Sequence, residues 1–317
     1  MSQANLNGAV VQETSNERSV IANALHIVYE EFGDASNPTI LLIMGLGRQM
    51  IAWPDDFCQG LADQGFRIIR FDNRDIGLSE KIDVSPPVSI PKLMLRKRLR
   101  WPIKVPYSLN DMALDAIGLL DALKIAQAHI VGVSMGGMIA QIIAADHSHR
   151  CTSLISVMSS SGNPSLPTAA WRINKLLINR PTSGNTAEVL AHTIKLRLAI
   201  GSPDYPPSNE YLKKRILKET QRSDYPIGFK HHLAAIIDNG DRRKLLKTIT
   251  APTLVIHGKG DSLVPADAGI DTAKNIAGAE LKLIEGMGHD LPMELLPKLV
   301  RLIGEHTHSC ESSLNKS

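Results

Sequence analysis

The sequence predicts an α/β fold in which a mostly parallel central sheet has helices on both faces and carries an inserted helical cap. Three observations lead to this prediction. Short apolar runs such as 39–44 (TILLIM) are too brief for buried helices and are closed by glycine, which is typical of strands buried on both faces. Segments with helical periodicity follow most of these runs, as in successive β-α-β units. The alternation stops between about 160 and 230, where helix-like segments occur without a convincing core strand.

The first part of the core begins with a hairpin and continues as alternating strands and helices. Two extended runs flank Ala22-Asn23 within residues 17–32, which indicates a hairpin that ends at 33–34. Beyond it we expect strands at 39–44, 67–71, 128–133 and 152–157, and helices at 55–64, 110–123 and 135–145.

The insertion separates this part from the rest of the core. Its helix-like segments span 170–178, 186–199 and 209–221. The strand and helix pattern then resumes, with strands expected at 252–256 and 281–284 and a last helix at about 293–305. The two ends of the chain are polar and have little to bury. The predicted division is a core of 17–159 and 231–306, a cap of 160–230, and flexible tails of 1–16 and 307–317.

Composition limits the classes of function. The 317 residues are 43% apolar and 21% charged, which is ordinary for a globular protein with a large core. The formal net charge of +3 is small for this size and does not indicate a nucleic-acid partner. Cys58, Cys151 and Cys310 lie far apart without CxxC spacing, which argues against a disulfide framework and against a zinc cluster.

Hydropathy along the chain indicates whether the protein is expected in a membrane, outside the cell or in the cytoplasm. No run reaches about 18 consecutive apolar residues, so we expect no transmembrane helix and no stable membrane insertion. Residues 1–20 lack a basic segment followed by an apolar one, so they do not read as a signal peptide. We therefore expect a cytoplasmic protein, and leave open whether it forms a homodimer.

A candidate nucleophile lies between a predicted strand and a predicted helix. The segment Gly132-Val133-Ser134-Met135-Gly136 matches G-x-S-x-G in the strand–turn–helix context that this motif requires. Its glycines allow a sharp, strained turn that lifts the Ser134 hydroxyl clear of the sheet. The Met135 N–H, at the start of the helix, can then face a developing oxyanion.

A serine hydroxyl needs a base, and the base needs a carboxylate to fix its tautomer. His289 follows the last predicted strand in a glycine-rich loop, at the carboxyl edge of the sheet where Ser134 also lies. Asp261 follows the strand before it, and the order Ser, Asp, His is the one expected for this motif. Asp267 is the fallback for the acid, and His257 is interpreted as a support for the loop.

A second oxyanion donor is expected from the loop after the first long buried strand. That loop is Met44-Gly45-Leu46-Gly47-Arg48, and its glycines let the backbone turn towards the Ser134 hydroxyl. By position we expect the Leu46 N–H to act together with the Met135 N–H. Losing one such donor typically costs about 3 kcal/mol of transition-state stabilisation.

Over roughly residues 20–305 the chain resembles the α/β-hydrolase superfamily. The segments LLIMGLG (41–47), WPDDF (53–57), FDNRDIGLS (71–79) and GVSMGG (132–137) look like those of the aclacinomycin methylesterase group and related carboxylesterases. The resemblance implies an α/β-hydrolase fold, ester hydrolysis without a cofactor or metal, and a helical cap over the site. The triad and both oxyanion donors carry over by position. Many family members have His-Gly where this chain has Met44-Gly45.

The substrate pocket and one charged segment are open to two interpretations each. Gly45, Met158, Trp171, Leu196 and Leu233 are candidate lining residues for an ester substrate. The alternative interpretation is that side chains in the cap hold it to the core. In the 71–79 segment, Arg74 and Asp75 are interpreted as a buried ion pair that holds the loops.

Residues 90–104 combine six basic residues with apolar ones, and no acidic residue occurs from 85 to 110. This segment could attract an anionic substrate, touch a membrane surface, or lie as a solvated helix over the core. We favour the solvated helix.

The leading hypothesis is a serine hydrolase that cleaves small to medium carboxylic esters through an acyl-enzyme on Ser134. A cofactor-free haloperoxidase or perhydrolase and a C–C hydrolase share the same triad and are alternatives. An alternative of another class is a binding protein that captures a small molecule without turnover. Covalent labelling together with measured turnover separates the binding protein from the enzymes.

Overall fold

The computed structural model of the chain describes residues 16–85, 87–179 and 186–314. Across these residues it contains one eight-stranded sheet, in the order β1-β2-β4-β3-β5-β6-β7-β8. The first pairings, β1 with β2 and β2 with β4, are antiparallel, and all later pairings are parallel. The strands are β1 (Arg18–Ala22), β2 (Leu25–Phe32), β3 (Thr39–Ile43), β4 (Arg67–Phe71), β5 (Ala128–Val133), β6 (Cys151–Val157), β7 (Thr253–Gly258) and β8 (Glu280–Ile284).

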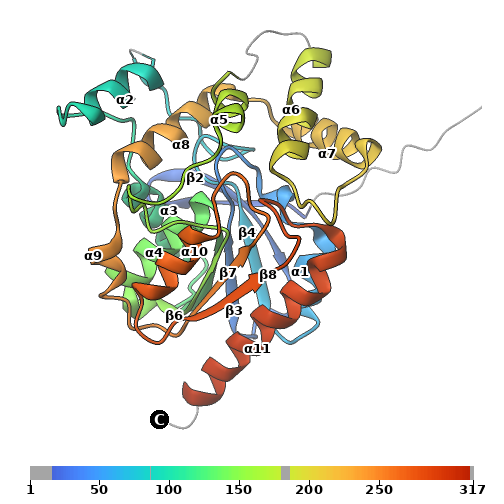
Figure 1. The fold of residues 1–317 in the computed structure, drawn as a ribbon. Coiled ribbons are helices and arrows are strands. Elements are labelled where there is room, and N and C mark those ends of the chain that lie inside the picture. The colour runs from blue at the N-terminus through green and yellow to red at the C-terminus, as the bar shows by residue number, and fades with distance from the viewer. Residues whose placement is uncertain (1–15, 86, 180–185, 315–317) are drawn as a thin grey trace, which may run out of the picture.

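Helices cover both faces of this sheet and its carboxyl edge (Figure 1). They are α1 (Asp55–Ala62), α2 (Ile90–Arg98), α3 (Leu109–Ala122), α4 (Met135–Asp146), α5 (Trp171–Ile178), α6 (Thr186–Ile200), α7 (Asn209–Arg222), α8 (Pro226–Asn239), α9 (Arg243–Leu246), α10 (Asp267–Lys274) and α11 (Leu296–Leu314). Short 3-10 helices are η1 (Met50–Ala52), η2 (Ser148–Arg150) and η3 (Met293–Leu295). The predicted mostly parallel sheet with helices on both faces is confirmed.

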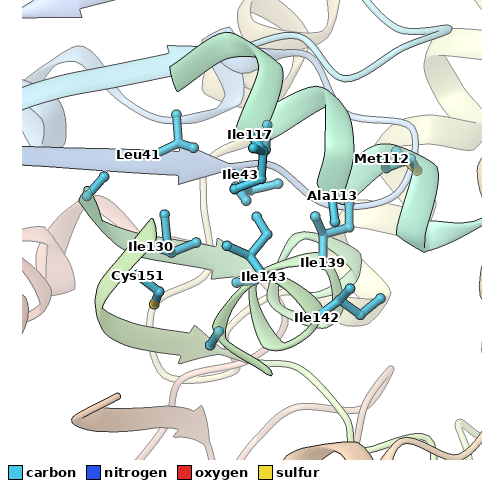
Figure 2. Packing of buried hydrophobic residues seen from close by; sticks show 14 of the residues in the cluster. Leu41, Ile43, Met112, Ala113, Ile117, Ile130, Ile139, Ile142, Ile143 and Cys151 are labelled. Atoms are coloured by element: carbon cyan, nitrogen blue, oxygen red, sulfur yellow. The ribbon is translucent and has the colours of Figure 1, made fainter. Parts of the chain in front are cut away.

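Two hydrophobic cores lie on opposite faces of the sheet because side chains alternate along each strand. On β3, Leu41 and Ile43 belong to the cluster that includes residues of α3 and α4. Figure 2 shows these two side chains facing residues of the helices, among them Ile117 and Ile139. Ile40 lies on the other face, in the cluster that includes residues of α1 and α11. Burial on both faces explains why β3 is apolar from Ile40 to Ile43.

The predicted flexible tail of 307–317 is wrong for the residues that the structure describes. Helix α11 continues to Leu314. Thr307 is fully buried, the His308 ring lies 4.6 Å from that of Phe66, and Glu311 approaches the buried His129 ring at 3.0 Å. The predicted tail therefore has an inward face that polar composition concealed. Most of the tail expected at 1–16 lies outside the described residues.

Four helices follow the break in alternation, and we call α5, α6, α7 and α8 the cap helices. The predicted segments 170–178, 186–199 and 209–221 match α5, α6 and α7 closely. The boundary expected at residue 230 falls inside α8, which runs unbroken to Asn239 and ends where Gly240 adopts a φ of 68°. No helix in the described ranges is long and apolar enough to cross a membrane.

Candidate active site

Ser134 sits on a strained turn between β5 and α4. Its φ is 55° and its ψ is −118°, a conformation that residues with a side chain rarely adopt. The turn is held at its carbonyl, which accepts hydrogen bonds from the Gly137 N–H at 3.0 Å and the Ser159 hydroxyl at 2.7 Å. A β-carbon at Gly132 or at Gly136 would lie 2.1 Å from a backbone oxygen, so both motif glycines are required by close approach of neighbouring chain.

The structure brings together the three side chains that the sequence singled out. The His289 Nε2 lies 3.0 Å from the Ser134 Oγ, and the His289 Nδ1 lies 2.7 Å from the Asp261 Oδ2. They follow β8, β5 and β7 respectively, so the carboxyl ends of three parallel strands supply the arrangement. Figure 1 shows these strand ends directed towards the cap helices.

The environment of Asp261 keeps it ionised. Burial alone raises its pKa, but the charge of a protonated His289 and hydrogen bonds from His257 and His289 outweigh burial and lower the pKa to about 2. The backbone N–H groups of Leu263 and Val264 also donate to its Oδ1, at 3.0 and 2.8 Å. A fixed negative charge beside the His289 Nδ1 selects the tautomer whose Nε2 can accept a proton from Ser134.

The other candidates near the acid have different surroundings. His257 is fully buried and bonds the Val264 carbonyl through its Nε2 at 2.8 Å, which agrees with its interpretation as a support for the loop. Asp267 is exposed at the start of α10. Asp290 bonds the Ser202 hydroxyl at 2.5 Å. Neither Asp267 nor Asp290 has a hydrogen bond to the His289 ring among the described residues.

The loop after β3 passes directly over Ser134. A β-carbon at Gly45 would lie 3.1 Å from the Ser134 Cβ, so only a very small residue fits there without displacing its neighbour. Within the described ranges, neither the Leu46 N–H nor the Met135 N–H donates a hydrogen bond to another protein group. Backbone donors without a protein partner are what an oxyanion hole requires, so this pair stays the expected one.

Two buried side chains that sequence reasoning missed hold this loop. The Asn73 amide donates to the Met44 carbonyl at 3.0 Å. The His232 Nδ1 accepts from the Gly47 N–H at 3.3 Å, and its Nε2 donates to the Arg74 carbonyl at 2.8 Å. Burial lowers the pKa of His232 to about 4, so it is neutral and can accept at Nδ1. Asn73 lies in a segment that the sequence did mark, whereas His232 carried no local signal.

The interpretation of Arg74 and Asp75 as an ion pair with each other is wrong. Arg74 forms its ion pair with Asp115, at 2.5 Å. Asp75 instead accepts from the Tyr107 hydroxyl at 2.5 Å and lies 2.9 Å from the His231 Nδ1. Arg74 and Asp75 are consecutive residues and Asp75 has a φ of 68°, so their side chains leave in different directions. They tie α3 and α8 to the loop after β4.

The end of α6 is tied to the loops that carry the acid and the base. The Ile200 carbonyl accepts from the His289 N–H at 2.7 Å, and the Ala199 carbonyl accepts from the Ser262 hydroxyl at 2.9 Å. The Ser202 hydroxyl accepts from the Gly288 N–H at 2.8 Å. Orphan carbonyls at a helix end are thereby satisfied by the loops of the site.

The predicted pocket residues are dispersed. Gly45 touches Ser134, and Met158 is buried directly after β6. Leu196 is half-buried in α6, whereas Leu233 packs in the cluster that α2 and α8 share. Trp171 is 68% exposed, and the Arg172 guanidinium lies over its ring. Of these five, only Gly45 is close to the serine in the contacts that the structure gives.

A polar cavity adjoins the loop after β3. Its walls come from that loop, from the loop after β4, and from α6, α7 and α8; they include Gly47, Arg197, Glu219, Tyr225 and Phe229. Arg48 and Arg197 both pair with Glu219, at 3.1 and 2.5 Å. In the described part of the chain, no group of three or more His, Cys, Asp or Glu side chains is placed to hold a metal ion.

Comparison with known proteins gives consistent matches. A family model for the alpha/beta hydrolase fold matches residues 38–294. Rhodomycin D methylesterase DauP from Streptomyces sp. (strain C5) is 27% identical over 311 residues, which cover 92% of this chain and 98% of that protein. A 2-hydroxy-6-oxononadienedioate/2-hydroxy-6-oxononatrienedioate hydrolase from Burkholderia vietnamiensis (strain G4 / LMG 22486) is 27% identical over 291 residues, covering 89% of this chain and 90% of that protein.

Solved structures agree on the fold. The enol-lactonase from Burkholderia xenovorans LB400 superposes with a TM-score of 0.70 at 22% identity, covering 91% of this chain and 99% of that one. The meta-cleavage product hydrolase CumD from Pseudomonas fluorescens IP01 superposes with a TM-score of 0.72 at 20% identity, covering 92% and 97%.

Proposed function

This chain belongs to the alpha/beta hydrolase fold family, and from that premise we propose that it is an esterase that cleaves carboxylic esters through an acyl-enzyme on Ser134. The observation that carries the proposal is the continuous chain of contacts from the Ser134 Oγ through both nitrogens of His289 to Asp261, with separations of 3.0 and 2.7 Å. These separations lie within hydrogen-bond reach, which proton transfer requires.

The proposed reaction has two halves. His289 takes the Ser134 proton as the Ser134 Oγ attacks the ester carbonyl, and the resulting oxyanion accepts hydrogen bonds from the Leu46 and Met135 N–H groups. The intermediate collapses, the bond to the alkoxide oxygen breaks, and His289 gives its proton to the leaving alcohol. Water then enters, loses a proton to His289, and attacks the acyl carbon, which releases the acid and restores the Ser134 hydroxyl.

We infer the substrate class from the named activities of relatives and from the residues that line the cavity. The rhodomycin D methylesterases, at 27% identity, favour esters of small alcohols such as methanol. We propose that the cap helices cover the bound acyl group, with the cavity at Gly47 as part of its binding site. This extends the proposed cap beyond residue 230 to the end of α8.

A C–C hydrolase is the second candidate, since relatives at 27–31% identity are named as hydrolases of 2-hydroxy-6-oxo dienoic and trienoic acids. Such enzymes and esterases share a nucleophile, base and oxyanion donors, so the triad does not separate them. Parallel assays with methyl esters and with a 2-hydroxy-6-oxo dienoic acid separate the two activities. Perhydrolysis is checked in the same assays with added peroxide.

Location and assembly are also proposed. Three free, buried cysteines suit a reducing compartment, so we propose that the enzyme works in the cytoplasm. A homodimer stays a prediction that analytical ultracentrifugation tests.

Replacing the nucleophile tests the proposed function. Ser134→Ala should reduce hydrolysis of p-nitrophenyl acetate by about 10⁴-fold or more, because every step runs through the lost oxygen. Ser148→Ala, which removes an exposed hydroxyl in η2 before β6, serves as the matched control and should retain most activity. Circular dichroism should be unchanged in both variants. Turnover near that of the unmodified protein in Ser134→Ala would refute the assignment, and no turnover of any ester by the unmodified protein would favour a binding role.

A further inference from the structure

Helix α2 and the turn that follows it expose apolar side chains among basic ones. Met94, Leu95, Leu99 and Trp101 are 51%, 57%, 46% and 58% exposed. We call these four residues, together with Arg98 and Arg100 between them, the basic apolar patch. So many large apolar side chains exposed within eight consecutive residues is unusual for a surface facing only water.

The helix already has a buried face, and part of the patch lies opposite to it, with Met94 on the flank. Ile90 and Leu93 are buried and cluster with Ala234 of α8. At about 100° per residue, Leu95 and Leu99 project to the side of α2 away from that cluster. An amphipathic helix that only covered the core would have polar residues there. The expected solvated helix over the core is therefore correct for one face of α2 and incomplete for the other.

The positive charges around the patch are mostly unneutralised. Arg96 and Lys97 donate to the carbonyls of Pro102 and Asp238, at 2.9 and 2.8 Å. The remaining four basic side chains are exposed and make no ion pair or hydrogen bond with any described residue: Lys92, Arg98, Arg100 and Lys104. The sequence from 85 to 110 contains no acidic residue, so this positive charge is not balanced within its own segment.

We propose that the basic apolar patch binds the surface of a lipid bilayer rich in anionic lipids. Headgroup phosphates would neutralise the four free cations, and the apolar side chains between them would enter the boundary of the acyl chains. Trp101 has the amphipathic ring that favours this interface. Nucleic acid would neutralise the cations but leave Leu95 and Met94 in water. A lipid surface would both neutralise the basic side chains and bury the apolar ones.

The basic apolar patch lies at the cap end of the molecule, which determines how a bound protein would be oriented. In Figure 1, α2 lies at the same end of the molecule as the cap helices, beside α8. A protein docked through α2 would therefore turn its cap end towards the bilayer, where apolar esters accumulate. This goes beyond the proposed esterase activity and does not require it, because vesicle binding is measured without turnover.

Vesicle co-sedimentation of the full chain tests the proposal. The protein should sediment with vesicles of phosphatidylcholine mixed with phosphatidylglycerol, and far less with phosphatidylcholine alone, with binding weakened by salt. Arg98→Glu with Arg100→Glu should lower the affinity by about thirtyfold or more, since each basic residue near such a surface contributes about fivefold. Leu95→Ser with Trp101→Ser should also weaken binding.

The matched control is Lys298→Glu with Arg301→Glu, two exposed basic residues of α11, which Figure 1 shows at the opposite end of the molecule from α2. This pair changes the net charge by the same amount and should leave binding unchanged. A blue shift of tryptophan emission on adding the mixed vesicles should be reduced in Trp101→Phe. Thermal melting should show that all variants are folded.

Three results would overturn the proposal. Equal binding to both vesicle types would remove the need for anionic lipid. Equal loss in the Lys298 and Arg301 control, or no loss in Leu95→Ser with Trp101→Ser, would reduce the effect to general charge. Absence of vesicle binding, together with a dimer in solution that the Leu95 and Trp101 substitutions dissociate, would make the patch an interface between two copies.

Discussion

The carboxyl edge of the sheet holds its side chains in fixed orientations, whereas the cap helices leave large apolar side chains exposed. At the edge, Ser134, Asp261 and His289 each have an orientation set by short hydrogen bonds and by glycines that admit no β-carbon. In the cap, apolar side chains such as Trp171 and Ile227 are exposed at 68% and 48%. The contrast indicates that the edge fixes the chemistry, whereas the exposed positions of the cap can vary in sequence with less effect on it.

The largest effect that would test this contrast is expected from replacing Asp261, the carboxylate partner of His289. Asp261→Asn should lower kcat for p-nitrophenyl acetate by about 10³- to 10⁴-fold, because the neutral amide favours the wrong tautomer of His289. Asp267→Asn, at an exposed position six residues on, should have little effect. Similar losses in both variants would mean that Asp261 is not the partner of His289.

The next effect concerns His232, which supports the loop of the expected oxyanion hole. His232→Ala should lower kcat by about tenfold to a hundredfold with little change in KM, because a displaced Leu46 N–H weakens only transition-state binding. His232→Asn should restore part of the rate, since its Oδ1 can replace Nδ1 as acceptor for the Gly47 N–H. Equal changes in kcat and stability for both variants would indicate a purely structural role.

A smaller effect is expected on the free energy of unfolding at low pH. The pKa of Asp261 is about 2 in the folded chain, below its ordinary value of 3.8. Its contribution to stability is therefore fully present above about pH 4 and is lost as the pH falls towards 2, and it amounts to about 2 kcal/mol. Urea unfolding between pH 5 and pH 2 measures this loss, which Asp261→Asn should diminish. An unchanged pH dependence in that variant would contradict the assigned pKa.

The smallest effect should come from an exposed side chain of the cap. Trp171→Ala should change the free energy of unfolding by less than about 0.5 kcal/mol and leave kcat/KM for short esters nearly unchanged, because the side chain is mostly exposed. A large rise in KM for bulky esters alone would restore Trp171 as a pocket residue. A large loss of stability would show that the cap is as constrained as the sheet edge.

The same contrast explains what could be predicted from the sequence. Ser134, Asp261 and His289 were found because each follows a recognisable strand, and parallel strands bring such positions to one edge. The link through His232 could not be found in this way, since it joins α8 to a loop 185 residues earlier and needs the fold to exist. Trp171 was named as an apolar residue of the expected cap, and apolarity alone does not specify which side of a helix faces the pocket.

The helical end of the chain was missed for a related reason. Residues 307–314 are polar on average, yet Thr307 and Cys310 face inward on α11. Average polarity hides one inward stripe in a helix, because three or four buried positions in two turns are enough to hold it.

Mass spectrometry after treatment with a fluorophosphonate tests the central claim most directly. The account predicts one phosphonyl adduct on the peptide that contains Ser134, formed rapidly in the unmodified protein and far more slowly in His289→Ala. An unmodified Ser134 in protein that still hydrolyses esters, or labelling that proceeds equally fast without His289, would contradict it.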